Sequence, residues 1–243
     1  MSPRIDVVEH EPGAPLGRMA DWLREQEIDV VVHRPYAGDQ LPHGDSLEAL
    51  IVLGGQPGAY DDERVPWLPS LRELISDVVD TETPLLGICL GAQLLAVAVG
   101  GEVQRSQRGP EIGVVEVELT DEAFEDALAG QLPGPYKGFS YHYDEVTKLP
   151  PHAVRLGGTA EFPNQLFRVG TYAWGIQSHP EVAPARFLSW MNRDVNGLPT
   201  DERALTRRRV AELDEVLQSH GQAVAYAFAR VVKEATAVGL DPA

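Results

Sequence analysis

The chain has 243 residues, of which 43% are hydrophobic, and this content is sufficient for one large α/β domain with a sizeable core. Its single cysteine excludes a framework of internal disulfides and is typical of a reducing compartment. The 37 acidic and 20 basic residues give a net charge of −17, which argues against nonspecific binding to nucleic acid or to an anionic membrane, because both attract a basic face.

The N-terminal segment has mixed composition. It lacks the basic and apolar regions of a secretory signal, and no apolar run approaches the roughly 18 residues that span a bilayer. We therefore expect a cytoplasmic protein that binds neither nucleic acid nor a membrane, and we interpret the acidic excess as a solubilising surface.

Strand-like and helix-like segments alternate in the first half of the chain. We expect strands at Ile5–Val8, Asp29–His33 and Ala49–Leu53, and helices at Leu16–Gln26 and Trp67–Val79. The second of these strands is short and β-branched, which is typical of a buried parallel strand. The repeated order predicts an α/β fold with an open, mostly parallel sheet and helices on both faces. Ligands of such sheets bind beyond the carboxyl ends of the strands.

A glycine-rich loop, Gly54–Gly58, follows the strand at Ala49–Leu53. A phosphate-binding loop is the competing interpretation, but the Lys-Ser/Thr pair and the three-glycine dinucleotide spacing are missing. We interpret the loop as a tight turn whose amides point into a crevice, and we assign an oxyanion-stabilising amide to Gly55.

The only cysteine, Cys89, lies in the frame Gly-Ile-Cys-Leu-Gly at residues 87–91. An apolar strand at Thr83–Leu86 precedes this frame and a helix-like run at Ala92–Ala98 follows it, which is the context of a nucleophile elbow. The glycines permit the turn, and the positive end of the helix favours a thiolate. The amide of Leu90 is the usual first oxyanion donor in such an elbow. On these five residues alone, an inert buried cysteine remains the alternative.

The middle of the chain has a different pattern. Ile112–Leu119 alternates like a half-exposed strand, and glycine or proline separates further short strand candidates. These candidates are Tyr136–Tyr143, Val154–Leu156, Gln165–Val169 and Tyr172–Ile176. We expect a small antiparallel or mixed addition to the parallel sheet.

A catalytic cysteine needs a base, because a thiol with a pKa of about 8.5 is only a few per cent thiolate at neutral pH. Of the seven histidines, His179 follows a strand candidate and precedes Pro180 and Glu181. Glu181 can accept a hydrogen bond from the imidazole, which completes the arrangement of nucleophile, base and orienting carboxylate. The tripeptide is a weak signal alone, but with the elbow it predicts a triad of Cys89, His179 and Glu181.

The last segment, from Thr200 to about Gly239, is charged and amphipathic. It predicts two helices divided near His220-Gly221, and Thr200–Glu202 offers capping groups to the first. Arg207–Arg209 lies among acidic residues, so we interpret it as a solvated helix face rather than a basic patch. We divide the chain into a catalytic domain at residues 1–195 and a helical extension at residues 196–243, packed on the same domain.

Three segments resemble, in order and spacing, the class I (triad-type) glutamine amidotransferases: Gly54–Gly58, Gly87–Gln93 and His179–Glu181. His142–Val146, followed by Leu149-Pro150, is similar to a His-Gly-Asp-x-Val segment followed by Leu-Pro in those domains. The resemblance covers about residues 3–193 and is nearest to the amidotransferase domain of GMP synthase and to stand-alone proteins similar to it. It implies a flavodoxin-like fold, and we expect neither a metal nor a cofactor.

The resemblance also implies a reaction. Cys89 would attack the γ-carboxamide of glutamine, His179 would give the departing ammonia its proton, and Glu181 would hold His179. Water would then hydrolyse the γ-glutamyl thioester.

Gln93, Tyr141, His142 and Tyr143 would contact the glutamine by the same resemblance. The chain departs from the family pattern at Ala92, where histidine is frequent, and at the two tyrosines, where small or polar residues are usual. The tyrosines would narrow the pocket or reshape it for a larger γ-glutamyl compound.

The segment after Glu181 is too short for an ATP-using synthetase domain and holds no Ser-Gly-Gly-x-Asp-Ser loop. We therefore expect either a separate synthetase subunit as partner or a stand-alone hydrolase of glutamine or γ-glutamyl amides. A non-catalytic binding module is disfavoured because all three triad members are present. An α/β-hydrolase is disfavoured because its acid precedes the histidine by a long interval.

Overall fold

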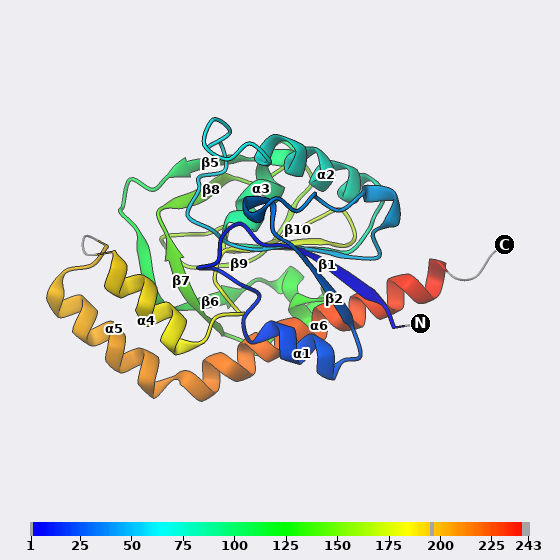
Figure 1. The fold of residues 1–243 in the computed structure, drawn as a ribbon. Coiled ribbons are helices and arrows are strands. Elements are labelled where there is room, and N and C mark those ends of the chain that lie inside the picture. The colour runs from blue at the N-terminus through cyan, green and yellow to red at the C-terminus, as the bar shows by residue number, and fades with distance from the viewer. Residues whose placement is uncertain (1, 195–196, 240–243) are drawn as a thin grey trace.

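The computed structural model describes residues 2–194 and 197–239 and has a central sheet flanked by helices (Figure 1). The strands are β1 (Arg4–Val8), β2 (Asp29–His33), β3 (Leu50–Val52), β4 (Leu85–Ile88), β5 (Glu102–Arg105), β6 (Glu111–Leu119), β7 (Tyr136–His142), β8 (Asp144–Lys148), β9 (Val154–Gly158), β10 (Leu166–Val169) and β11 (Ala173–Ile176). The α-helices are α1 (Met19–Glu25), α2 (Leu68–Asp80), α3 (Leu90–Ala98), α4 (Pro184–Arg193), α5 (Thr200–Glu212) and α6 (Asp214–Gly239).

Nine of the described strands form one sheet in the order β2-β1-β3-β4-β11-β10-β9-β6-β7. The strands from β2 to β11 pair in parallel, whereas β10, β9, β6 and β7 continue the sheet with antiparallel pairs. A separate antiparallel ribbon consists of β5 and β8. The open sheet flanked by helices and the added antiparallel strands, both predicted from the sequence, are confirmed.

The expectation that Asp29–His33 is a buried strand is wrong. This segment, β2, forms the edge of the sheet and pairs only with β1 among the described strands. Val31 in its middle is 41% exposed. Branched residues favour any pleated strand, so their presence does not distinguish a central strand from an edge strand.

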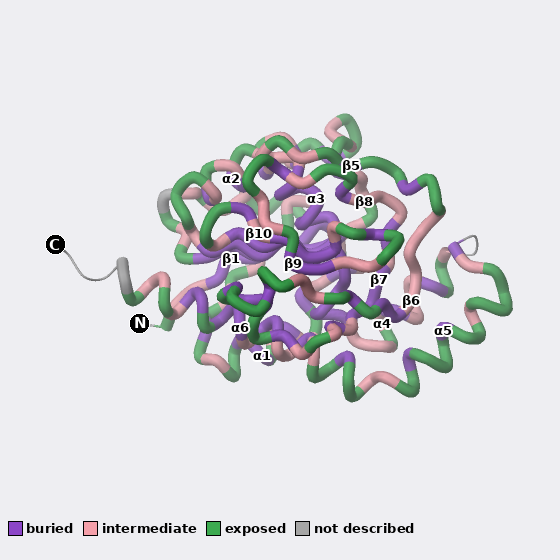
Figure 2. Tube along the Cα trace, turned by 180° about the vertical axis from the view of Figure 1, so that it is seen from behind, coloured by how far each residue is buried: buried purple, intermediate pink, exposed green. Residues whose placement is uncertain are grey.

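Alternate side chains of the central strands enter two separate cores. Ile51 and Leu86 face a core shared with α1 and α6, whereas Leu50 and Leu85 face a core shared with α2 and α3. A strand with its period of two gives this alternation when helices cover both faces of the sheet. Figure 2 shows the strands as a buried centre and the outer helix faces as exposed. A third apolar cluster joins α4 and α5 to β6 and β7.

The helix break expected near His220-Gly221 does not occur. The helices divide at Leu213 instead, and His220 and Gly221 lie inside α6. A Cβ atom on Gly221 would stand 2.3 Å from the carbonyl oxygen of Pro180 and 3.2 Å from the Trp22 ring. The glycine therefore permits close packing of α6 and does not act as a helix breaker. The domain boundary expected at residues 195 and 196 lies outside the described residues.

No helix in the described ranges is both long and apolar enough to cross a membrane.

Candidate active site

Cys89 stands at a strained turn between β4 and α3. Its backbone has φ of +51° and ψ of −106°, a conformation that costs a non-glycine residue about 1–3 kcal/mol and persists only where the surroundings impose it. The flanking glycines are required by space: a Cβ atom on Gly87 would lie 2.5 Å from the Gly91 carbonyl oxygen, and one on Gly91 would lie 2.0 Å from that of Val52. The geometry is that of a nucleophile elbow.

His179 reaches Cys89 because their strands are neighbours. The strands β4 and β11 pair in parallel, so their carboxyl ends lie at the same edge of the sheet. The Cys89 amide donates to the Ile176 carbonyl at 2.8 Å, and the His179 amide donates to the Phe139 carbonyl at 2.7 Å. The His179 Nδ1 atom lies 2.8 Å from Glu181 Oε1, and both side chains are buried. The structure thus brings together the three residues of the predicted triad.

The charges at this site favour a protonated imidazole. Burial alone would lower the pKa of His179, but the Glu181 carboxylate and the Cys89 sulfur together raise it above its ordinary value. The sulfur acts both as a charge and as a hydrogen-bond partner of the ring. The arrangement can hold a proton on His179 that faces the nucleophile.

The glycine-rich loop packs directly against these groups. A Cβ atom on Gly54 would stand 3.3 Å from Cys89 Cβ and 2.8 Å from His179 Cε1, so only a glycine leaves room there. The next residue, Gly55, lines the same cleft as Cys89, whereas Leu90 is buried at the start of α3. The backbone on both sides of the sulfur is therefore in place for an oxyanion hole.

A cleft of about 710 Å³ opens above the triad. All four residues expected to contact substrate line it, together with Cys89 and His179: Gln93, Tyr141, His142 and Tyr143. Glu181 lies behind His179 and outside the cleft lining. Among the described residues, no group of three or more His, Cys, Asp or Glu side chains is arranged to hold a metal ion.

The cleft has further lining residues that the sequence motifs did not identify. One is Trp190 on α4, whose ring centroid lies 4.9 Å from that of His179. Another is Glu11, whose carboxylate accepts a hydrogen bond from the Gln56 amide and whose pKa is raised by burial. Pro184 at the first turn of α4 was the available signal for this helix. The remaining charged ones are Asp61, Arg64, Arg105, Asp144, Arg193 and Asp194.

The two tyrosines are anchored to the end of α4. The Tyr141 hydroxyl donates to Asp194 Oδ2 at 3.0 Å, and the Tyr143 hydroxyl donates to the same oxygen. The Arg105 guanidinium stacks 4.5 Å above the Tyr143 ring. Burial, followed by the hydrogen bond to Asp194, raises the pKa of Tyr143 to about 12, and the same causes raise the pKa of Tyr141. Both hydroxyls therefore remain donors at neutral pH.

Comparisons with sequence families and curated proteins agree with this geometry. The profile of the family described as glutamine amidotransferase class-I matches residues 18–195. The glutamine amidotransferase-like protein YfeJ of Salmonella typhimurium is 30% identical over 182 residues, which are 73% of this chain and 75% of that protein.

Two further relatives are matched over a smaller part of their length. The glutamine-hydrolysing GMP synthase of Aeropyrum pernix is 36% identical over 150 residues, 62% of this chain and 27% of that protein. Gamma-glutamyl peptidase 4 of Arabidopsis thaliana is 30% identical over 139 residues, 56% of this chain and 55% of that protein.

The fold has close counterparts among solved structures. A crystal structure of a glutamine amidotransferase from Thermotoga maritima has a TM-score of 0.80 to this chain at 28% identity. The match covers 94% of this chain and 99% of that one.

Proposed function

Since this chain belongs to the class-I glutamine amidotransferase family, we propose that it hydrolyses the γ-carboxamide of glutamine through a thioester on Cys89 and releases ammonia. The observation that carries the proposal is the placement of Cys89, at the strained turn, beside the buried His179–Glu181 pair. We also propose the cytoplasm as its compartment, because the single cysteine is typical of a reducing environment.

In the acylation step the Cys89 sulfur attacks the γ-carbonyl carbon. The amides of Leu90 and Gly55 stabilise the oxyanion of the tetrahedral intermediate. The carbon–nitrogen bond then breaks, and His179 transfers its proton to the leaving nitrogen, which departs as ammonia. Glu181 keeps the imidazole in the required orientation throughout.

In the second step water hydrolyses the thioester. Neutral His179 takes a proton from the water as its oxygen attacks the carbonyl carbon, and the carbon–sulfur bond breaks. Glutamate leaves, and the thiolate and the imidazolium are restored.

The released ammonia needs an acceptor in an amidotransferase. We propose a separate synthetase subunit as the partner, by analogy with the GMP synthase relative.

A second candidate is a stand-alone hydrolase of γ-glutamyl peptides or amides. The cleft of about 710 Å³ favours it, because this volume is in the range that holds drug-sized ligands rather than a single amino acid. The wall of Tyr141 and Tyr143, which is unusual for the family, favours it as well.

The test is an assay of the purified protein with glutamine, γ-glutamyl peptides and γ-glutamyl amines, in which glutamate and the released amine are both measured. We expect turnover by the wild type and none by Cys89→Ala. Turnover without any partner supports the stand-alone hydrolase, and activity that requires an added synthetase supports the amidotransferase subunit. Full activity of Cys89→Ala would contradict the mechanism.

A further inference from the structure

The side-chain amide of Gln93 has one possible orientation. Its Nε2 atom lies 3.0 Å from the carbonyl oxygen of Asp144 and 3.2 Å from Oε1 of Gln177. A backbone carbonyl only accepts hydrogen bonds, so the atom that faces it must be the nitrogen. Both amide hydrogens of Gln93 are therefore directed at the protein. Its oxygen is the group that remains for the cleft, which Gln93 lines.

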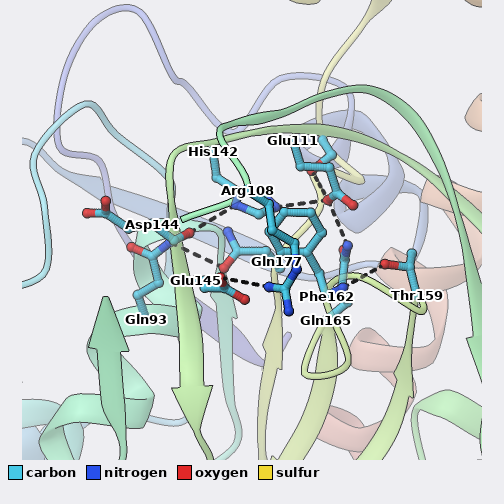
Figure 3. Close-up of polar contacts among 11 residues, drawn as sticks. Gln93, Arg108, Glu111, His142, Asp144, Glu145, Thr159, Phe162, Gln165 and Gln177 are labelled. Atoms are coloured by element: carbon cyan, nitrogen blue, oxygen red, sulfur yellow. Dashed lines mark hydrogen bonds and ion pairs between the residues drawn. The ribbon is translucent and has the colours of Figure 1, made fainter. Parts of the chain in front are cut away.

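The same carbonyl also holds His142. The His142 Nδ1 atom lies 2.9 Å from the Asp144 carbonyl oxygen, and Nε2 lies 2.9 Å from Glu111 Oε2 on the neighbouring strand β6 (Figure 3). The edge of the ring packs against Phe162 at a centroid distance of 5.2 Å. Both nitrogens of His142 are thus engaged by the protein, although one edge of the residue borders the cleft.

Glu111 is fixed in turn by two further donors. Its Oε2 atom accepts hydrogen bonds from Ser140 Oγ at 2.6 Å and from Gln165 Nε2 at 2.7 Å, in addition to the contact with His142. A carboxylate with several buried donors is held more rigidly than any single contact would hold it. A continuous path of hydrogen bonds therefore runs from β6 through His142 and the Asp144 carbonyl to the elbow helix α3.

We propose that Glu111 and His142 are positioning residues that fix the Asp144 carbonyl and thereby direct the amide oxygen of Gln93 into the cleft. The oxygen then accepts a hydrogen bond from the α-ammonium group of the γ-glutamyl substrate. The inference rests on the proposed function, because it assigns a role in recognition of that substrate. It gives His142 an indirect role in place of the direct substrate contact expected from the family resemblance.

Glu111→Gln tests this assignment, because it keeps the size of the side chain and removes the charge of the acceptor. We expect the KM for glutamine to rise about 10-fold, the effect of one weakened charge-assisted hydrogen bond, while kcat changes little. The matched control is Glu145→Gln, whose side chain is similarly buried but pairs with Arg108 instead. This control should leave both constants unchanged.

Two reagents that modify Cys89 separate recognition from general damage, because Cys89 is the only cysteine of the chain. Iodoacetamide requires only the thiolate, whereas the diazoketone glutamine analogue 6-diazo-5-oxo-L-norleucine also requires recognition of the amino-acid end. We expect Glu111→Gln to slow the reaction with the analogue and to leave the reaction with iodoacetamide unchanged. Equal slowing of both reactions would overturn the positioning role.

A double-mutant cycle with Gln93→Ala tests whether Glu111 acts through Gln93. If it does, Glu111→Gln has no further effect on KM in the Gln93→Ala background. Additive effects on KM would overturn the proposal. A wild type that neither hydrolyses a γ-glutamyl substrate nor reacts with the analogue would refute the proposed function. A wild type that reacts, combined with a Glu111→Gln variant that reacts equally fast, would refute the positioning role alone.

Discussion

The imidazole of His179 and the carboxylate of Glu181 form a buried pair, with 2.8 Å between Nδ1 and Oε1 and side-chain exposures of 3% and 1%. Only one residue separates them in sequence, so the chain must turn sharply at Pro180 to bring the side chains together. The Glu181 carbonyl also accepts a hydrogen bond from the Arg18 amide at 2.9 Å, which ties this segment to the start of α1. The orientation of the proposed proton donor is therefore built into the backbone.

Glu181→Gln should shift the pH dependence of the reaction. The Glu181 carboxylate raises the pKa of His179, so its removal lowers that pKa and the imidazolium is lost at lower pH. We expect the alkaline limb of kcat/KM for glutamate release to move down by about one pH unit or more. A profile of kcat/KM between pH 5 and pH 10 measures the shift, and the exposed Glu116→Gln serves as control. An unmoved alkaline limb would show that Glu181 does not set the charge of His179.

His10 should make the protein sensitive to acid. It is buried beside Gly55, its Nδ1 accepts a hydrogen bond from the Trp67 indole at 3.2 Å, and burial lowers its pKa to about 4. Below its unfolded pKa of 6.5 the unfolded chain binds a proton that the folded chain does not, so stability is lost as the pH falls from 6.5 towards 4.

The variant His10→Asn keeps an acceptor near the indole and removes the titrating group. Between pH 7.5 and pH 5 the free energy of unfolding of the wild type should fall by about 2 kcal/mol more than that of the variant. Urea unfolding at the two pH values measures this difference. Equal losses in the two proteins would mean that His10 is protonated in the folded state.

Gly221→Ala should destabilise the protein, against the usual sign of this substitution. In a helix interior, alanine is favoured over glycine by about 1 kcal/mol. Here the added methyl would stand 2.3 Å from the carbonyl oxygen of Pro180, so α6 must move away from the segment that carries the triad. We expect a net loss of about 1–3 kcal/mol in the free energy of unfolding, together with reduced kcat.

The exposed Ser219→Ala on the same helix is the control for helix propensity. It should leave the stability and kcat of the protein nearly unchanged. Thermal and urea unfolding of the two variants separate the effects. A Gly221→Ala variant more stable than the wild type would show that the close approach of α6 is not required.

The parts of the fold that could be predicted are those with a local cause. The apolar runs of β3 and β4 need two covered faces, and the glycines around Cys89 need a tight turn, so each segment indicates its own environment. The meeting of Cys89 with His179 follows from the topology, because parallel neighbours end at the same edge of a sheet.

Features set by distant packing could not be predicted in the same way. Gly221 has the composition of a helix end, and only its contact with Pro180 explains why it lies inside a helix. Glu111 occurs at the start of an alternating strand, where a carboxylate usually faces solvent, and its three donors come from other segments. Asp194 in the cleft had no motif to mark it, because its role depends on two tyrosines on another strand.

The tyrosine wall yields a prediction about substrate size. Tyr141 and Tyr143 both donate to Asp194, and Arg105 covers the Tyr143 ring, so the wall is a fixed surface rather than a loose obstruction. We expect Tyr143→Ala to lower kcat/KM for a γ-glutamyl peptide more than for glutamine, because only the larger substrate extends along this surface. Asp194→Asn, which weakens the common acceptor, should change the ratio in the same direction by a smaller factor. Tyr143→Phe retains the ring and its contact with Arg105 and serves as the matched control. Parallel assays with the two substrates measure the ratio, and a shift of preference towards the peptide would mean that the tyrosines narrow the cleft and restrict it to glutamine.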